Sequence, residues 1–149
     1  MSMTNLANEL AHKADGAERT GEKRMVLVVE DDEKSAKLFR LLLEAEGFSV
    51  LWAADSESAL CIAPQHALSL ITLDLQLPGI INGWSFLRRM RGISTLAHVP
   101  VIIISGQPVN ELAADHGAAA MLQKPIRRAQ LKTALSGLGL APADQSREL

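Results

Sequence analysis

Reactive side chains stand at the ends of four short apolar runs in this sequence. Asp74 closes the run that begins at Leu70, and the turn signal of Pro78 and Gly79 follows it. The other three runs end in the acidic pair Glu30 and Asp31, in Ser105 and in Lys124. Because a charge near a buried strand is expensive without a partner, we expect Asp74 to meet partners from the other strand ends.

Three carboxylates around one crevice, those of Glu30, Asp31 and Asp74, predict a metal site. Like charges at close range raise one another's pKa unless a cation lies among them, and a ligand set made only of oxygens suits Mg²⁺ rather than zinc. A carboxylate can attack a phosphoryl group, in a reaction that depends mainly on positioning and on neutralising charge. In that chemistry Lys124 would pair with one phosphoryl oxygen, and the Ser105 hydroxyl would donate to another.

The elements that must position these groups alternate between strand and helix five times. The sequence predicts strands at 26–29, 48–53, around 70–74, 99–104 and 118–122, and helices at 33–46, 55–63, 84–91, 109–116 and 128–138. Parallel strands need crossover connections, so this alternation predicts a doubly wound α/β domain with a five-stranded parallel sheet and helices on both faces. In the flavodoxin-like strand order 2-1-3-4-5, the switch point falls between the strands that end in Glu30–Asp31 and in Asp74.

This ordered set of motifs resembles the receiver domain of two-component response regulators, over roughly Arg24 to Gly137. The resemblance implies that Asp74 is the phosphoacceptor and also a ligand of Mg²⁺. It further implies that Asp31 ligates the metal directly, that Glu30 acts through water, and that the backbone carbonyl of Gln76 supplies another ligand. The same resemblance suggests a cis peptide bond before Pro125.

Several features depart from the pattern usual in that family. The switch residues would be Ser105 and Met121, and methionine replaces the family's aromatic side chain on the fifth strand, which would separate the two switch positions less sharply. The loop from Asp74 to Gly83 is one residue longer than usual, and the stretch from Ser105 to Lys124 is shorter. The shorter stretch would shorten the fourth helix or the loop that enters it. That helix forms the family's usual output and dimerisation face together with the fifth strand and fifth helix, so we expect a monomer or a weak dimer.

Composition limits what else this chain can be. Its 149 residues leave room for one domain, and with 48% hydrophobic but only 3% aromatic residues the core must be aliphatic. A net charge of −2 with no basic block argues against direct binding to DNA or to a membrane surface. No stretch approaches the roughly 18 apolar residues that span a bilayer, and the N-terminus lacks the apolar core of a secretion signal. We therefore expect a cytoplasmic protein without membrane insertion.

Three parts of the chain are expected from these patterns. A flexible extension over 1–23, with room for a short helix around 6–13, precedes the receiver domain at 24–138, and a flexible tail covers 139–149. The single cysteine, Cys61, lies in an apolar helical pattern and is predicted to be a buried thiol in a reducing compartment. Trp52 and Trp84 are predicted to be packing residues.

We therefore expect a stand-alone receiver, because no output domain follows Leu138 in this sequence. It would take a phosphoryl group from a phosphohistidine on a sensor histidine kinase or a histidine phosphotransfer protein. It would then act on a downstream protein and would not be an enzyme beyond its own phosphorylation and dephosphorylation.

Two alternatives stay open from the residues alone. One is a receiver-like interaction module that signals without phosphate. The other is a Mg²⁺-dependent aspartyl phosphatase or phosphotransferase similar to haloacid dehalogenases. Such enzymes carry a second aspartate two residues after the nucleophile on the first strand, where this chain has Glu33 after Asp31.

Overall fold

A computed structural model describes residues 23–108 and 117–141 of the chain. Most of the predicted N-terminal extension lies outside the described residues, as does the short helix expected within it. The helix predicted over 109–116 lies outside them too, and so does most of the predicted tail. The two described ranges contain all the strand ends at which the sequence places reactive side chains.

Five parallel strands form one sheet in the order β2-β1-β3-β4-β5. Their bounds are β1 (Arg24–Val29), β2 (Phe48–Ala53), β3 (Leu70–Leu73), β4 (Val101–Ser105) and β5 (Ala120–Gln123). The predicted flavodoxin-like topology is confirmed. The first strand begins two residues earlier than expected, and the last two begin two residues later. β3 is buried at all four positions, as expected for a central strand covered on both faces.

Four α-helices accompany these strands in the described ranges, namely α2 (Glu33–Ala45), α3 (Ser56–Ile62), α4 (Gly83–Arg91) and α6 (Arg128–Gly137). Three of them begin at polar side chains that accept a hydrogen bond from the amide three residues on: Asp32, Asp55 and Asn82. A short 3₁₀ helix, η1 (Ala63–Gln65), continues α3. Its second residue is Pro64, so the chain tightens into a different helix at the position where the sequence predicted a stop.

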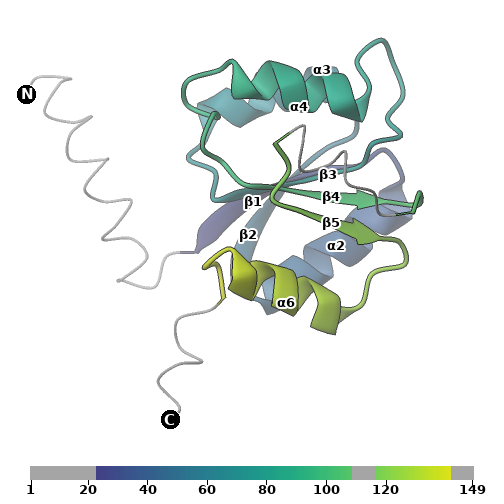
Figure 1. Ribbon diagram of the computed structural model, residues 1–149, viewed down its shortest axis with the longest axis vertical. Coiled ribbons are helices and arrows are strands. Elements are labelled where there is room, and N and C mark those ends of the chain that lie inside the picture. The colour runs from purple at the N-terminus through teal and green to yellow at the C-terminus, as the bar shows by residue number, and fades with distance from the viewer. Residues whose placement is uncertain (1–22, 109–116, 142–149) are drawn as a thin grey trace, which may run out of the picture.

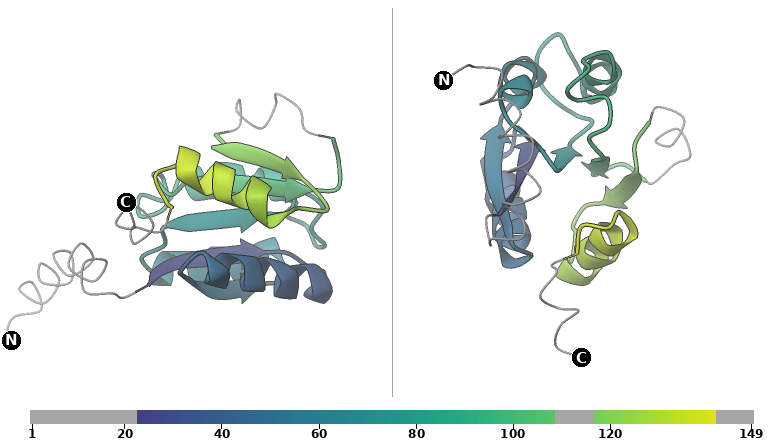
Figure 2. Two further views of the ribbon diagram at one scale, coloured as in Figure 1. Left: turned by 90° about the horizontal axis from the view of Figure 1, so that it is seen from below. Right: turned by 90° about the vertical axis from the view of Figure 1, so that its left-hand side faces the viewer.

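The helices cover the two faces of the sheet in pairs (Figure 1). α3 and α4 pack on one face and α2 and α6 on the other, and the end-on view in Figure 2 shows the sheet between these two layers. The core is aliphatic apart from Phe39, Phe48 and Phe86, as the composition predicted. Two separate apolar clusters result, one on each face of the sheet. Both faces of the central strands are thereby buried.

Two arginines join elements that are far apart in the chain. The guanidinium of Arg91, at the end of α4, donates to the carbonyl oxygens of Val99 at 2.8 Å and Gly117 at 2.7 Å, which precede β4 and β5. Arg128 Nε donates to the buried carboxylate of Glu46 at 3.0 Å and so links the start of α6 to the end of α2. The Arg91 contacts fix the entries of β4 and β5, and the Arg128 contact ties together the two helices on the other face.

Cys61 is exposed, so the prediction of a buried thiol is wrong. The reason is which side of α3 faces the core: Ser56 and Ala59 lie on the buried side, and Cys61 lies on the exposed side. In a helix of only seven residues, one buried stripe is too short for the sequence to show which side faces the core.

Trp52 was also expected to be a packing residue, yet it is 42% exposed on β2. That prediction is wrong for much of this side chain, because β2 is an edge strand with no further strand beside it to cover the ring. Trp84 is half-buried and packs against the cluster that includes Phe86, as predicted. Within the described residues, no helix is long and apolar enough to cross a membrane.

The buried hydroxyl of Ser56 generates a stability prediction. Ser56 is fully buried at the first position of α3, and its Oγ has no hydrogen-bond partner among the described residues. An unsatisfied buried polar group destabilises the folded state, and alanine is also the better helix former. We expect Ser56→Ala to raise the free energy of unfolding by about 1 kcal/mol in urea denaturation. Ser136→Ala, at an exposed position of α6, controls for helix propensity, and an equal gain in both variants would contradict the explanation.

The start of α4 generates a second prediction. A Cβ on Gly83 would lie 2.6 Å from both the Asp74 carbonyl oxygen and the Leu75 Cα, which are backbone atoms that cannot move aside cheaply. We expect Gly83→Ala to destabilise the fold by about 1–3 kcal/mol in urea denaturation. Gly137→Ala, where a Cβ meets nothing, is the matched control and should be neutral or stabilising. Wild-type stability in Gly83→Ala would show that the close approach is not required.

Candidate functional site

Three carboxylates meet at the carboxyl ends of the neighbouring strands β1 and β3. Glu30, Asp31 and Asp74 each offer an oxygen within 4.8 Å of the others. Glu30 and Asp74 are buried, at 1% and 5% exposure, whereas Asp31 is exposed. Backbone hydrogen bonds fix the positions of Glu30 and Asp74 at the edge of the sheet. The Glu30 amide donates to the Ala53 carbonyl at 3.0 Å, and the Asp74 amide donates to the Val29 carbonyl at 3.0 Å. The prediction that these three acids lie close together is confirmed.

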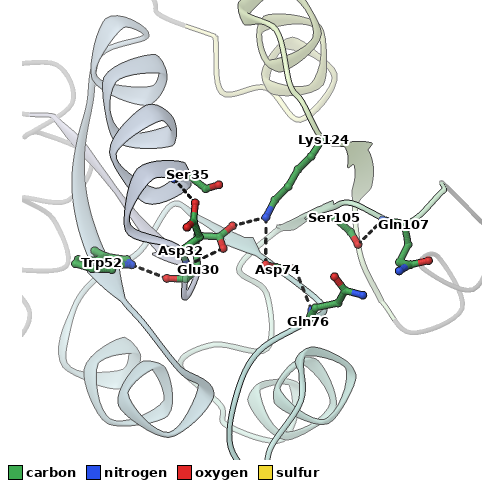
Figure 3. A network of polar contacts seen from close by, with 9 residues as sticks. All are labelled: Glu30, Asp32, Ser35, Trp52, Asp74, Gln76, Ser105, Gln107 and Lys124. Atoms are coloured by element: carbon green, nitrogen blue, oxygen red, sulfur yellow. Dashed lines mark hydrogen bonds and ion pairs between the residues drawn. The ribbon is translucent and has the colours of Figure 1, made fainter.

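Lys124 reaches into this cluster from the end of β5 (Figure 3). Its Nζ lies 2.8 Å from Glu30 Oε1 and 3.2 Å from Asp74 Oδ2, so one ammonium bridges two buried carboxylates. The Lys124 amide donates to the Ser105 carbonyl at 2.8 Å, which fixes the residue at the edge of the sheet. Its ammonium also lies 5.8 Å from the centre of the Phe39 ring, within the range of a cation–π contact.

Backbone amides hold the two buried carboxylates from the other side. The Asp32 amide donates to Glu30 Oε2 at 3.1 Å, and the Gln76 amide donates to Asp74 Oδ1 at 3.0 Å. The backbone carbonyl of Glu30 is held as well, because the Trp52 indole N–H donates to it at 2.7 Å (Figure 3). Backbone amides of the β1–α2 turn and of the β3–α4 loop thus orient the carboxylates of Glu30 and Asp74.

The pKa values follow from burial and from the shared cation. Desolvation, with a smaller contribution from the Asp74 charge, raises the pKa of Glu30 to about 7, although Lys124 and the Asp32 amide act in the opposite direction. Burial by itself would lower the pKa of Lys124, but Glu30 and Asp74 outweigh it and raise that pKa. Lys124 therefore stays charged while Glu30 binds a proton more readily than an ordinary carboxyl.

The residues present fit a Mg²⁺ ion by the chemistry of their donors. All three side chains are carboxylates, the oxygen ligands that this cation prefers. The buried Glu30 Oε1 has only the ion pair with Lys124 and no directed hydrogen bond. The Asp31 carboxylate has no hydrogen bond or ion pair to other described residues and is open to solvent. Both features leave ligand capacity for a cation, whose charge would also oppose the raised pKa of Glu30.

Ser105 ends β4 beside this cluster and is fully buried. Its Oγ accepts a hydrogen bond from the Gln107 amide at 3.1 Å, and among the described residues no hydrogen bond joins it to Asp74. Met121 is paired in register with Ile103 and packs partly into the cluster under α3 and α4. The peptide bond between Lys124 and Pro125 is cis, as predicted.

Sequence reasoning missed two side chains that hold the site. Phe39 reads as an ordinary core position of α2, and nothing in the sequence says that the Lys124 ammonium lies over its ring. The sequence pattern indicates only a hydrophobic strand residue at Trp52, whereas in the structure its indole N–H donates to the Glu30 carbonyl. The one available signal was that tryptophan carries a polar group that must find a partner when it lies against protein.

Comparison with known proteins agrees with this geometry. The family model of the response regulator receiver domain matches residues 26–136. The chain is 33% identical over 106 residues to the polar-differentiation response regulator DivK of Brucella anthropi, which covers 69% of this chain and 85% of that protein. It is 36% identical over 113 residues to the transcriptional regulatory protein YkoG of Bacillus subtilis, covering 74% of this chain and 48% of that protein.

Solved structures show the same fold. The receiver domain of the sensor histidine kinase PA1611 from Pseudomonas aeruginosa, described with a magnesium ion coordinated in its active site cleft, is 25% identical with a TM-score of 0.70, covering 78% of this chain and 98% of that one. The Vibrio cholerae chemotaxis protein CheY4 is 24% identical with a TM-score of 0.71, over 77% of this chain and 98% of its own, and shows the fold alone.

The family match spans most of the chain, and the match to DivK covers 85% of that protein. The acidic cluster and its lysine lie at the strand ends expected for this family. The chain belongs to the response regulator receiver domain family of two-component systems and is a signalling domain rather than a conventional enzyme.

Proposed function

We propose that Asp74 accepts a phosphoryl group from a phosphohistidine, and that this modification controls binding to another protein. The observation that carries the proposal is the bridge from Lys124 to Asp74 at 3.2 Å and to Glu30 at 2.8 Å, inside a cluster of three acids. An ammonium held against the acceptor carboxylate is placed to pair with a phosphoryl oxygen once that group arrives.

Mg²⁺ is the proposed cofactor. Asp31 and Asp74 would hold it directly, Glu30 would act through water, and the backbone carbonyl of Gln76 would supply a further ligand. The donor set supports this assignment, as does the magnesium ion described in the PA1611 receiver domain. When bound, the metal would neutralise negative charge on the phosphoryl oxygens during transfer.

The transfer proposed for this chain is a simple displacement. An oxygen of the Asp74 carboxylate forms a bond to phosphorus, the phosphorus–nitrogen bond of the donor phosphohistidine breaks, and the electron pair leaves with the imidazole. The product is an acyl phosphate on Asp74. Lys124 contributes positive charge, the Ser105 hydroxyl donates a hydrogen bond to a phosphoryl oxygen, and the Gln76 amide keeps the acceptor carboxylate oriented.

The proposed output runs through Ser105 and Met121. The Gln107 amide already occupies an acceptor site of the Ser105 hydroxyl at 3.1 Å, and the hydroxyl proton stays available as a donor. Movement of Ser105 towards the phosphoryl group would open space near β5, which Met121 would follow inward. The proposed partners are a sensor histidine kinase or histidine phosphotransfer protein upstream and an unidentified protein downstream.

The proposed domain covers 24–138, preceded by an extension over 1–23 and followed by a tail over 139–149. We propose that it works as a monomer or weak dimer without direct contact to DNA. Its place of action would be the cytoplasm, where histidine kinases have access to ATP. The family match over 26–136 supports the domain bounds.

Replacing the acceptor tests the proposal directly. After incubation with acetyl phosphate and Mg²⁺, we expect the intact mass of the wild-type chain to rise by one phosphoryl group, and we expect no gain in Asp74→Asn or without Mg²⁺. Asp55→Asn, the same change at the N-cap of α3, should be phosphorylated like wild type. Absence of a mass gain, together with unchanged tryptophan emission on adding beryllofluoride, would instead support an interaction module that signals without phosphate.

Removing Lys124 should separate metal binding from phosphoryl transfer. Its ammonium competes with a cation for Glu30 and Asp74, so we expect Lys124→Met to bind Mg²⁺ more tightly, by roughly fivefold, the order of one partly exposed charge pair. Phosphorylation by acetyl phosphate should nevertheless slow by at least about tenfold, because the phosphoryl oxygens lose their cation.

Calorimetric Mg²⁺ titration and intact-mass time courses measure the two effects. Lys37→Met, at an exposed lysine of α2, controls for the loss of one positive charge. Weaker Mg²⁺ binding in Lys124→Met would contradict the competition argument, and unchanged phosphorylation would contradict the role of Lys124 in transfer.

A further inference from the structure

Trp52 combines two properties that rarely occur together. Its ring is 42% exposed on the edge strand β2, where a polar residue would be the ordinary choice. Yet its only polar side-chain atom, the indole Nε1, donates to the backbone carbonyl of Glu30 at 2.7 Å (Figure 3). An exposed aromatic side chain thus reaches the acidic cluster by one directed hydrogen bond.

That hydrogen bond takes over where the sheet ladder ends. The Glu30 amide donates to the Ala53 carbonyl, which is the last rung between β1 and β2. In a parallel ladder the Glu30 carbonyl would next accept from the amide of Asp55. The chain has already left the strand there, because Asp55 is the N-cap of α3. The Trp52 indole supplies the donor that the backbone no longer provides.

The carbonyl of Glu30 shares one rigid peptide plane with the amide of Asp31. Fixing that carbonyl therefore sets the direction in which the Asp31 side chain leaves the backbone. This matters because Asp31 is exposed, and its carboxylate has no hydrogen bond or ion pair to other described residues. Glu30 and Asp74 are oriented through their own carboxylates, by Lys124 and by backbone amides. Within the described part of the chain, Asp31 is oriented only through its backbone.

We propose that Trp52 is a positioning residue for Mg²⁺, which aims the Asp31 carboxylate by holding the peptide plane between Glu30 and Asp31. The inference rests on the proposed function, since it assigns Trp52 a role at the Mg²⁺ site. Trp52 touches neither metal nor phosphoryl group, and its effect is on metal affinity. The transfer chemistry of Asp74 and Lys124 is independent of it.

A packing role is the competing explanation, and the surroundings provide a control for it. The Trp52 ring lines a shallow groove of about 160 Å³ between β2 and α2, whose other lining residues are Glu33, Ala36, Lys37, Arg40 and Val50. Val50 stands two residues before Trp52 on the same face of the same strand. Val50→Ala removes packing from the groove and leaves the indole hydrogen bond in place.

The test is a Mg²⁺ titration followed by ¹H–¹⁵N NMR on wild type, Trp52→Phe and Val50→Ala. Phenylalanine keeps a ring in the groove and removes the N–H. We expect Trp52→Phe to raise the Mg²⁺ dissociation constant about fivefold, the order of one net hydrogen bond, and Val50→Ala to leave it unchanged. Phosphorylation of Trp52→Phe by acetyl phosphate should be slow at low Mg²⁺ and return to the wild-type rate at saturating Mg²⁺.

A second measurement uses the wild-type chain and does not depend on a variant folding. Because coupling between two sites is reciprocal, Mg²⁺ must slow solvent exchange of the Trp52 indole proton if that proton helps to hold the metal site. The indole signal is assigned with Trp84→Phe. We expect slower exchange on adding Mg²⁺, and unchanged exchange would overturn the proposal.

Other outcomes separate the failure of this inference from that of the proposed function. Equal Mg²⁺ affinity in wild type and Trp52→Phe overturns the role of Trp52, and so does an equal loss in Trp52→Phe and Val50→Ala, which would show packing alone. A phosphorylation defect that persists at saturating Mg²⁺ also overturns it. If wild type shows no Mg²⁺-dependent shifts, the proposed Mg²⁺ site itself is wrong and this inference falls with it.

Discussion

The structure depends on accommodating two carboxyl groups where water scarcely reaches. Glu30 and Asp74 are 1% and 5% exposed, and each offers an oxygen within 4.8 Å of the other. An unpaired buried charge costs several kcal/mol, so this arrangement persists only with compensation on every side. Lys124 supplies one shared cation, and the amides of Asp32 and Gln76 supply directed hydrogen bonds. Desolvation nevertheless outweighs these contacts at Glu30 and raises its pKa, so this carboxyl binds a proton more readily than an exposed one.

The parallel sheet brings these groups together. Carboxyl ends of neighbouring parallel strands share one edge, so Glu30 and Asp74 meet because β1 pairs with β3. Lys124 arrives from β5, two strands away from β3, and must span that width with its long side chain. Its backbone is fixed by Ser105 and its ammonium lies over Phe39, so the flexible stem is restrained at both ends. β3, which leads into Asp74, is buried at all four positions.

Features that follow from hydrophobic periodicity and from the residues at strand ends were predicted from the sequence. Features that depend on which side of a short helix or strand faces the core were missed. Strand β2 was predicted at its observed bounds, and the site acids were placed from the residues that follow apolar runs. Cys61 was misplaced because seven residues of α3 give too little pattern to locate a buried stripe. Trp52 was misread because its role depends on where the β1–β2 ladder stops, and that point is a property of two strands in register. No single segment carries that information.

Chemistry and readout make different demands on this fold. The acceptor site needs rigidity, and it is built from strand ends, backbone amides and one shared ammonium. The readout needs an element with two alternative positions of similar free energy. Ser105 is restrained, since the Gln107 amide already occupies an acceptor site of its hydroxyl and leaves the proton free to donate. Met121 is the partner proposed for it, and a thioether chain fills several shapes where a ring would fill one or two. In the readout proposed above, a flexible Met121 would keep the transfer chemistry unchanged and make the output graded rather than sharply two-state.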